Sequence, residues 1–135
     1  MSKPGKPYHL LVVDDDKIYL NSLIELLKNA GYSVSGAQNA RMALDEIKSD
    51  TVDLILLDIQ MPQMDGVDLV EHLRSKGNRK PIIMMTAYGD VSTYLKGKEL
   101  GITEYLTKPV TAKKLLAIIK TVLKESCSKA GYQHS

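Results

Sequence analysis

Aspartates gather at two places in the chain where an apolar run ends. Asp14, Asp15 and Asp16 directly follow the letters LLVV, and Asp58 closes the run DLILLD. Carboxylates held this close repel one another, and a cluster at the end of a strand costs free energy unless a cation neutralises it. Oxygen ligands that leave room for waters suit Mg²⁺. If the fold brings these groups together, we predict a magnesium site.

Two further side chains that could take part in a reaction follow other apolar runs. Thr86 ends the run IIMMT, and Lys108 comes directly after EYLT. A metal, a cation and a hydroxyl around one carboxylate are the parts that phosphoryl transfer needs, because this chemistry depends on positioning and charge neutralisation. Asp58 would be the nucleophile and form an acyl phosphate. Lys108 and the Thr86 hydroxyl would bind the phosphoryl oxygens.

Each of these residues also has an ordinary interpretation when it is taken alone. Asp16 precedes a predicted helix, and we expect it to cap that helix, because Asp is a favoured N-cap residue. Asp58 precedes a turn-forming segment, and Lys108 precedes a proline, so a turn role and a surface role stay open. The combination of these residue types at strand ends favours the phosphoryl-transfer site.

The elements that must position these residues are apolar strands alternating with amphipathic helices. We predict strands over 8–13, 33–37, 53–58, 81–87 and 103–107, and helices over 18–31, 40–49, 66–77, 90–101 and 111–126. Such alternation predicts parallel strands with helices on both faces of one sheet. The expected fold is an α/β, flavodoxin-like, doubly wound five-stranded parallel sheet of order 2-1-3-4-5 with five helices.

This strand order makes the first and third strands neighbours. In open α/β sheets, ligands bind at the carboxyl ends of the strands, near the point where the strand order switches. Asp14 and Asp15 should therefore meet Asp58 at that edge, with Thr86 and Lys108 beside them.

The bulk composition is that of one ordinary globular domain. The chain has 135 residues, a net charge of +2 and one cysteine, and it contains no apolar run long enough to span a membrane. We expect a cytoplasmic protein without direct nucleic-acid binding by this segment. The expected division is a disordered segment over 1–7, a folded domain over 8–126 and a C-terminal tail over 127–135.

Four segments together carry a family resemblance. LLVVDDD, DLILLDIQMPQMDG, IIMMTA and EYLTKP resemble, in this order, the receiver domain of two-component response regulators, over residues 8–125. The resemblance implies that Asp58 accepts a phosphoryl group from a phosphohistidine on a sensor histidine kinase or a histidine phosphotransfer protein. It also implies a signalling domain that catalyses its own phosphotransfer and autodephosphorylation, and is otherwise no enzyme.

The resemblance also implies a ligand set for Mg²⁺. Asp15 and Asp58 would bind the ion directly, Asp14 would act through a water, and Gln60 would offer its backbone carbonyl. From their places two residues after Asp58 and two after Thr86, we expect Gln60 and Tyr88 to flank the path of the water that hydrolyses the phosphoryl group, and so to set its lifetime. An ordinary loop tyrosine that points to solvent stays open for Tyr88.

A second implied feature is a switch. Thr86 and Tyr105 match the family's switch pair, which changes the face made by the fourth helix, fifth strand and fifth helix. Lys108–Pro109 matches a peptide bond that is usually cis. Val110 departs from the family, which commonly has Phe there. Regulators with winged-helix domains usually have paired acidic and arginine residues on the fourth and fifth helices, and this chain has Thr103, Lys114 and Ile118 at places where such residues are expected. The resemblance therefore does not extend to a winged-helix type dimer.

Three other functions are compatible with parts of this pattern. A haloacid dehalogenase-type phosphatase needs an Asp two residues after the nucleophile, where this chain has Gln60. A flavin binder needs a first loop that attracts phosphate, and DDDK would repel it. A receiver fold that only docks partners stays open. The sequence leaves open the kinase, the signal, the target, the oligomeric state, and whether the chain is complete.

Overall fold

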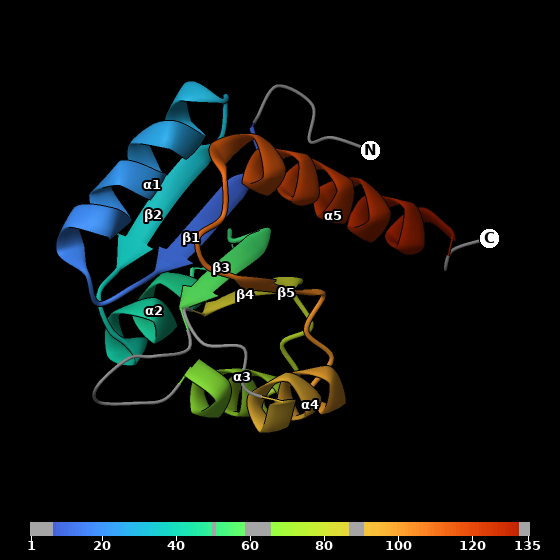
Figure 1. Cartoon of the computed structure of the whole chain (residues 1–135). Coiled ribbons are helices and arrows are strands. Elements are labelled where there is room, and N and C mark those ends of the chain that lie inside the picture. The colour runs from blue at the N-terminus through green and yellow to red at the C-terminus, as the bar shows by residue number, and fades with distance from the viewer. Residues whose placement is uncertain (1–6, 50, 59–65, 87–90, 133–135) are drawn as a thin grey trace.

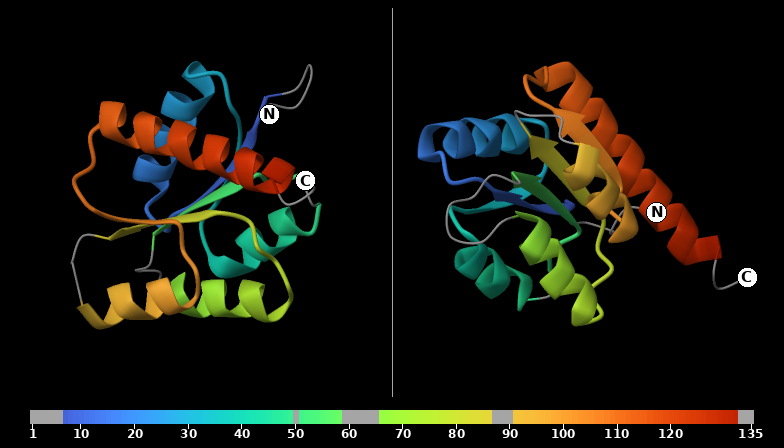
Figure 2. Two further views of the ribbon diagram at one scale, coloured as in Figure 1. Left: turned by 90° about the vertical axis from the view of Figure 1, so that its right-hand side faces the viewer. Right: turned by 60° about the horizontal axis from the view of Figure 1, so that its bottom comes forward.

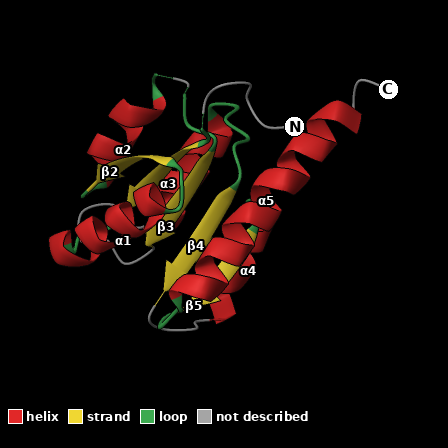
Figure 3. Ribbon diagram, turned by 90° about the horizontal axis from the view of Figure 1, so that it is seen from above, coloured by secondary structure: helices red, strands yellow, loops and turns green. Residues whose placement is uncertain are grey.

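The computed structural model describes residues 7–49, 51–58, 66–86 and 91–132. The elements follow one another as β1 (His9–Val13), α1 (Lys17–Asn29), β2 (Ser33–Ala37), α2 (Ala40–Ile47), β3 (Leu54–Asp58), α3 (Gly66–Ser75), β4 (Ile82–Thr86), α4 (Val91–Glu99), β5 (Glu104–Thr107) and α5 (Ala112–Tyr132). All strand pairs are parallel, and the order is β2-β1-β3-β4-β5 (Figures 1 and 3). The predicted fold class is confirmed.

Helices cover both faces of the sheet. Helices α1 and α5 lie on one face, and α2, α3 and α4 lie on the other (Figures 1 and 2). Along β1, Leu10 and Val12 belong to the core under α1 and α5, whereas Leu11 and Val13 belong to the opposite core. Side chains alternate along a strand, so a strand covered on both faces is apolar at every position. This explains the unbroken apolar runs in the sequence.

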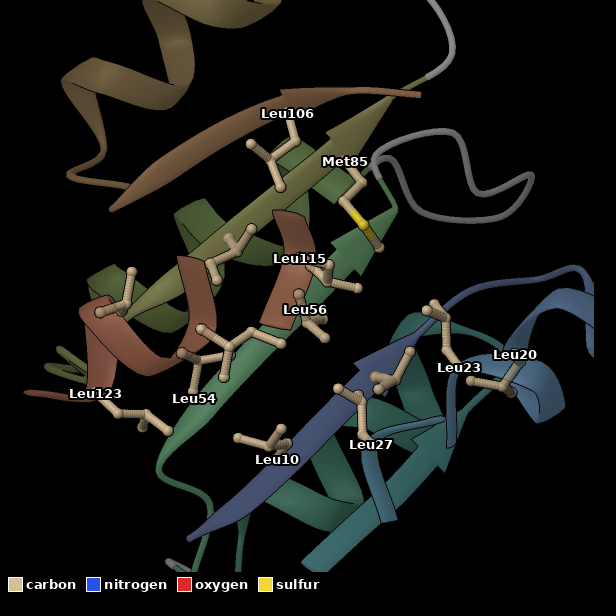
Figure 4. Packing of buried hydrophobic residues seen from close by; sticks show 14 residues of the cluster. Leu10, Leu20, Leu23, Leu27, Leu54, Leu56, Met85, Leu106, Leu115 and Leu123 are labelled. Carbon is tan, nitrogen blue, oxygen red and sulfur yellow. The ribbon is translucent and has the colours of Figure 1, made fainter. Parts of the chain in front are cut away.

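The core under α1 and α5 joins the two outer helices to the middle of the sheet. Leu23 and Leu27 of α1 and Leu115 and Leu123 of α5 point toward the strands, where they meet side chains such as Leu54 (Figure 4). Full burial of such a side chain is worth roughly 1.5–3 kcal/mol. The central strands are thereby held as a firm frame for the residues at their ends.

Glycines end three of the helices. Gly31, Gly77 and Gly101 have φ angles of 102°, 82° and 77°, and each follows a helix within two residues. This left-handed conformation strains residues that have a Cβ, and it is the common way to end a helix. The predicted ends of these three helices, at residues 31, 77 and 101, lie within two residues of the observed ends.

The last helix is longer than predicted. The expected end was residue 126, whereas α5 continues to Tyr132, so residues 127–132 of the predicted tail are helical. The segment CSKA at 127–130 contains no Pro or Gly, and nothing in it interrupts the helical hydrogen-bond ladder. The predicted disordered segment over 1–7 lies almost wholly outside the described residues. No helix in the described part of the chain is long and apolar enough to cross a membrane.

Helix α4 packs closely against the sheet because of Gly97. A Cβ at Gly97 would lie 2.8 Å from Cδ1 of Ile102 and 3.3 Å from Sδ of Met84. A glycine inside a helix also lowers the helix propensity of its segment. The structural role of Gly97 is to let α4 approach Ile102 and Met84.

Arg74 ties together the loops that precede β4 and β5. Its Nη1 donates to the backbone oxygens of Asn78 at 2.9 Å and Lys80 at 3.1 Å. Its Nε donates to the oxygen of Leu100 at 2.9 Å, and its Nη2 donates to that of Gly101 at 3.1 Å. One guanidinium therefore links α3 to both connections at the amino edge of the sheet.

We expect Arg74→Met to lower the free energy of unfolding by about 2–4 kcal/mol, because hydrogen bonds from a charged donor contribute roughly 1.5–3 kcal/mol and four carbonyls lose their partner. Urea denaturation measures the change. Arg79→Met is the matched control, since Arg79 is exposed and makes no hydrogen bond within the described part of the chain. Equal effects of the two substitutions would show that charge, and not the hydrogen bonds, is what matters.

Candidate functional site

The parallel register brings the chemically active residues to the same edge of the sheet. Val13 pairs with Leu57, so Asp14 and Asp58 follow at the same level on neighbouring strands. Asp58 pairs with Met85, directly before Thr86. The predicted convergence of the strand ends is confirmed.

Asp14, Asp15 and Asp58 form an acidic cluster. One carboxylate oxygen from each lies within 4.8 Å of the others. Asp14 is 1% exposed and Asp58 6% exposed, while Asp15 is exposed to solvent. The buried Oδ2 of Asp14 accepts no hydrogen bond from any residue that the structure describes. An all-oxygen donor set with an acceptor available and one side open to water fits a hard divalent cation such as Mg²⁺.

Lys108 lies beside the cluster. Its Nζ donates a hydrogen bond to Oδ2 of Asp58 at 2.8 Å and lies 3.7 Å from Oδ2 of Asp14. Its backbone N–H donates to the backbone oxygen of Thr86 at 2.6 Å. Its peptide bond to Pro109 is cis, as the resemblance implied. Burial lowers the pKa of Lys108, but the hydrogen bond and the charges of Asp58 and Asp14 outweigh it and raise that pKa above 10.5. Lys108 is therefore a cation aimed at the carboxylates.

Asp14 carries the electrostatic strain of the cluster. Its pKa is raised from 3.8 to about 6, first by burial and then by the charges of Asp58 and Asp15. The backbone N–H of Asp16, which donates to Oδ1 of Asp14 at 3.0 Å, and the charge of Lys108 both act in the opposite direction. The site thus keeps an excess of negative charge even with the lysine in place.

The prediction that Asp16 caps a helix is confirmed. Its Oδ1 accepts hydrogen bonds from the backbone N–H groups of Ile18 at 3.1 Å and Tyr19 at 3.2 Å. The cap fixes the first turn of α1 next to the cluster. Asp16 therefore shapes the site without belonging to the acidic cluster.

Tyr19 is a residue of the site that the sequence reasoning missed. The Nζ of Lys108 lies 4.6 Å from the centroid of its ring. Burial raises the pKa of Tyr19 above 10.0, so the ring is that of a neutral phenol. An aromatic residue in the first turn after the strand-end aspartates, within an otherwise aliphatic stripe, was the available signal.

The two predicted switch residues lie on neighbouring strands. Thr86 is fully buried at the end of β4. Tyr105 is half-buried on β5, and its ring packs edge-to-face on Tyr94 of α4, with centroids 5.2 Å apart and an interplanar angle of 86°. Tyr105 thus connects β5 to α4. Gln60 and Tyr88 lie outside the described residues, so their roles stay predictions.

A hollow in the surface lies away from the carboxylates. A groove of about 730 Å³ runs between α2 and α3 and is lined by residues such as Leu44, Ile47 and Leu73. It contains none of the predicted site residues. The site is therefore located by its charged groups and not by cavity volume.

Comparison with known proteins gives a consistent result. Residues 10–120 match the family described as the response regulator receiver domain. Response regulator MprA of Mycolicibacterium vanbaalenii is 41% identical over 125 residues, which are 93% of this chain and 54% of that protein. Response regulator MprA of Mycobacterium avium is 40% identical over 117 residues, which are 87% of this chain and 51% of that protein. The chain spans about half the length of these relatives.

Solved structures give the same fold. A CheY-like response regulator receiver domain protein from Methanospirillum hungatei has a TM-score of 0.88 and 31% identity, covering 92% of this chain and 99% of its own. Chemotaxis protein CheY4 of Vibrio cholerae has a TM-score of 0.81 and 30% identity, and the match covers 86% of this chain and 98% of that protein's chain.

The raised pKa of Asp14 predicts a pH dependence of stability in the absence of divalent cations. A carboxyl whose pKa is higher in the folded state stabilises the fold while it is protonated, and this contribution is lost as the pH rises from about 4 through about 6. The loss is about 2 kcal/mol between about pH 4.5 and about pH 7.5.

Urea denaturation in EDTA at both pH values measures this change. Asp14→Asn has no carboxyl at this position, so its free energy of unfolding should fall less than that of the parent. If both proteins lose the same amount, another group is responsible for the pH dependence.

Proposed function

The chain belongs to the response regulator receiver domain family, and we propose that Asp58 is its phosphoacceptor. The donor is a phosphohistidine on a sensor histidine kinase or a histidine phosphotransfer protein. The observation that carries the proposal is the 2.8 Å hydrogen bond between Lys108 Nζ and Oδ2 of Asp58, next to two further carboxylates at the switch point of the sheet.

The proposed reaction is an in-line displacement at phosphorus. A carboxylate oxygen of Asp58 forms a bond to the phosphorus, while the bond from phosphorus to the donor imidazole nitrogen breaks and its electron pair stays on that nitrogen. Lys108 neutralises charge on the phosphoryl oxygens, and the Thr86 hydroxyl donates a hydrogen bond to one of them.

Mg²⁺ is the proposed cofactor. Asp15 and Asp58 would hold it directly, with Asp14 acting through a water and Gln60 through its backbone carbonyl. The bound ion would supply charge neutralisation between the carboxylates and the incoming phosphoryl group. The fit of the acidic cluster to a hard cation supports this assignment.

We also propose that the domain catalyses the hydrolysis of its own acyl phosphate. Gln60 and Tyr88 would flank the approach of water. Neither side chain is a carboxylate, so neither serves readily as a general base at neutral pH. A moderately long-lived phosphorylated form follows from this proposal.

The proposed output is a change of the face made by α4, β5 and α5. Phosphoryl oxygens are strong acceptors that would draw in the Thr86 hydroxyl, and Tyr105 would then move inward behind it. The contact between Tyr105 and Tyr94 supports this route, because a movement of Tyr105 would reach α4 directly.

Acetyl phosphate and mass spectrometry test the phosphoacceptor. With millimolar Mg²⁺, the parent should gain the mass of one phosphoryl group, and with EDTA the gain should be at least tenfold slower, since the charge is not neutralised. Asp58→Asn should gain none. Asp53→Asn is the matched control, because Asp53 directly precedes the other end of β3 and accepts a hydrogen bond from the backbone N–H of His9. A parent that gains no mass would support a receiver fold that only docks partners.

Amide chemical shifts test the switch. In the parent, phosphorylation should shift the resonances of Tyr94, Tyr105 and their neighbours. Thr86→Ala should take up phosphate but lose most of these distant shifts, because it lacks the hydroxyl that follows the phosphoryl group. Unchanged shifts at Tyr94 and Tyr105 in the phosphorylated parent would contradict the proposed route.

A further inference from the structure

The ammonium group of Lys108 has neighbours on three sides. It donates to Oδ2 of Asp58 at 2.8 Å, it lies 3.7 Å from Oδ2 of Asp14, and the ring of Tyr19 covers it with a centroid distance of 4.6 Å. The lysine side chain is only 23% exposed. The ring is thus one wall of the space that holds the catalytic cation.

The position of this ring follows from the local structure of α1. Tyr19 belongs to the first turn, which the carboxylate of Asp16 caps through the N–H groups of Ile18 and Tyr19 itself. Its ring also packs against the core under α1 and α5. The cap and the core together keep the ring beside Lys108.

We propose that Tyr19 is a positioning residue for the phosphoryl-transfer site, holding the Lys108 ammonium group in line with Asp58 through the face of its ring. This inference deepens the proposed function of Asp58 and rests on it. The contact joins two distant parts of the chain, since Tyr19 follows the first strand and Lys108 follows the last.

The physical reason lies in what happens to the hydrogen bond of Lys108 during the reaction. When Asp58 becomes an acyl phosphate, its carboxyl group loses its charge, and the anionic phosphoryl oxygens replace it as the partners of the ammonium group. The attraction between a cation and an aromatic face does not change at this step, and it is stronger where water is excluded. The ring would therefore keep Lys108 near the phosphoryl oxygens throughout the reaction.

Tyr19 also fills space in the core, so the test must separate positioning from packing. Tyr19→Phe keeps the ring face, and Tyr19→Leu keeps an apolar side chain but removes the ring. Tyr32→Leu is the matched control. Tyr32 is half-buried and packs against the same core, but it follows the other end of α1.

The first measurement is the rate of phosphate uptake from acetyl phosphate with Mg²⁺. Tyr19→Leu should be about threefold to tenfold slower than the parent, the range expected for one partly desolvated cation–aromatic contact. Tyr19→Phe should have the rate of the parent. Tyr32→Leu should also have the rate of the parent, even if its melting temperature falls as much as that of Tyr19→Leu. A Tyr19→Leu rate equal to that of Tyr19→Phe overturns the proposal.

The second measurement needs no phosphate. Protons next to the face of an aromatic ring are shifted upfield, so the Lys108 Hε resonances should be upfield in the parent and in Tyr19→Phe, and at ordinary values in Tyr19→Leu. Identical shifts in the three proteins overturn the positioning of Lys108 by the ring. If the parent takes up no phosphate but the Hε shifts behave as expected, the proposed function of Asp58 has failed and the contact between Tyr19 and Lys108 has not.

Discussion

The repulsion between carboxylates held at adjoining strand ends is the constraint on which the rest of the structure depends. Asp14 and Asp58 are both buried and cannot separate, because β1 and β3 are paired in register and covered on both faces. Lys108 offsets part of this repulsion, yet the pKa of Asp14 is still raised to about 6. The site is thus prepared for additional positive charge, and a divalent cation supplies it in the proposed reaction.

The two edges of the sheet have different tasks. At the amino edge, Arg74 donates hydrogen bonds to four backbone oxygens in the loops before β4 and β5. These hydrogen bonds stabilise the fold. At the carboxyl edge, the fold holds like charges together at a cost in stability. A rigid frame at one edge lets strain be kept at the other, as is common at functional sites.

Helix α4 connects this strained edge to the surface. Gly97 permits its close approach to Ile102 and Met84, and the Tyr94–Tyr105 contact joins it to β5. Few of its described side chains are buried, and Leu95 is exposed. Over residues 94–99, the part of α4 whose side chains are described, little apolar burial therefore has to be broken to move the helix. This agrees with the proposed change of the face that α4 shares with β5 and α5.

The sequence by itself determined the architecture and the composition of the site. Unbroken apolar runs indicate strands buried on both faces, and their alternation with amphipathic helices indicates a doubly wound parallel sheet. In the expected flavodoxin-like strand order, Asp14 lies next to Asp58. These are local patterns combined with general rules of chain topology. Helix ends were predicted to within two residues where a glycine marks them, as at Gly31. The predicted end of α5 at residue 126 was wrong, because residues 127–130 contain no glycine or proline and the helix continues to Tyr132.

Only the tertiary structure decided which side chains of the helices touch distant parts of the chain. The ring of Tyr19 lies against Lys108 because the cap at Asp16 and the packing of α1 set the rotation of that helix. Arg74 reaches the oxygens of Leu100 and Gly101 because α3 and the loop before β5 meet in space. Such contacts depend on helix rotation and side-chain direction, which a periodic pattern of apolar residues leaves unspecified.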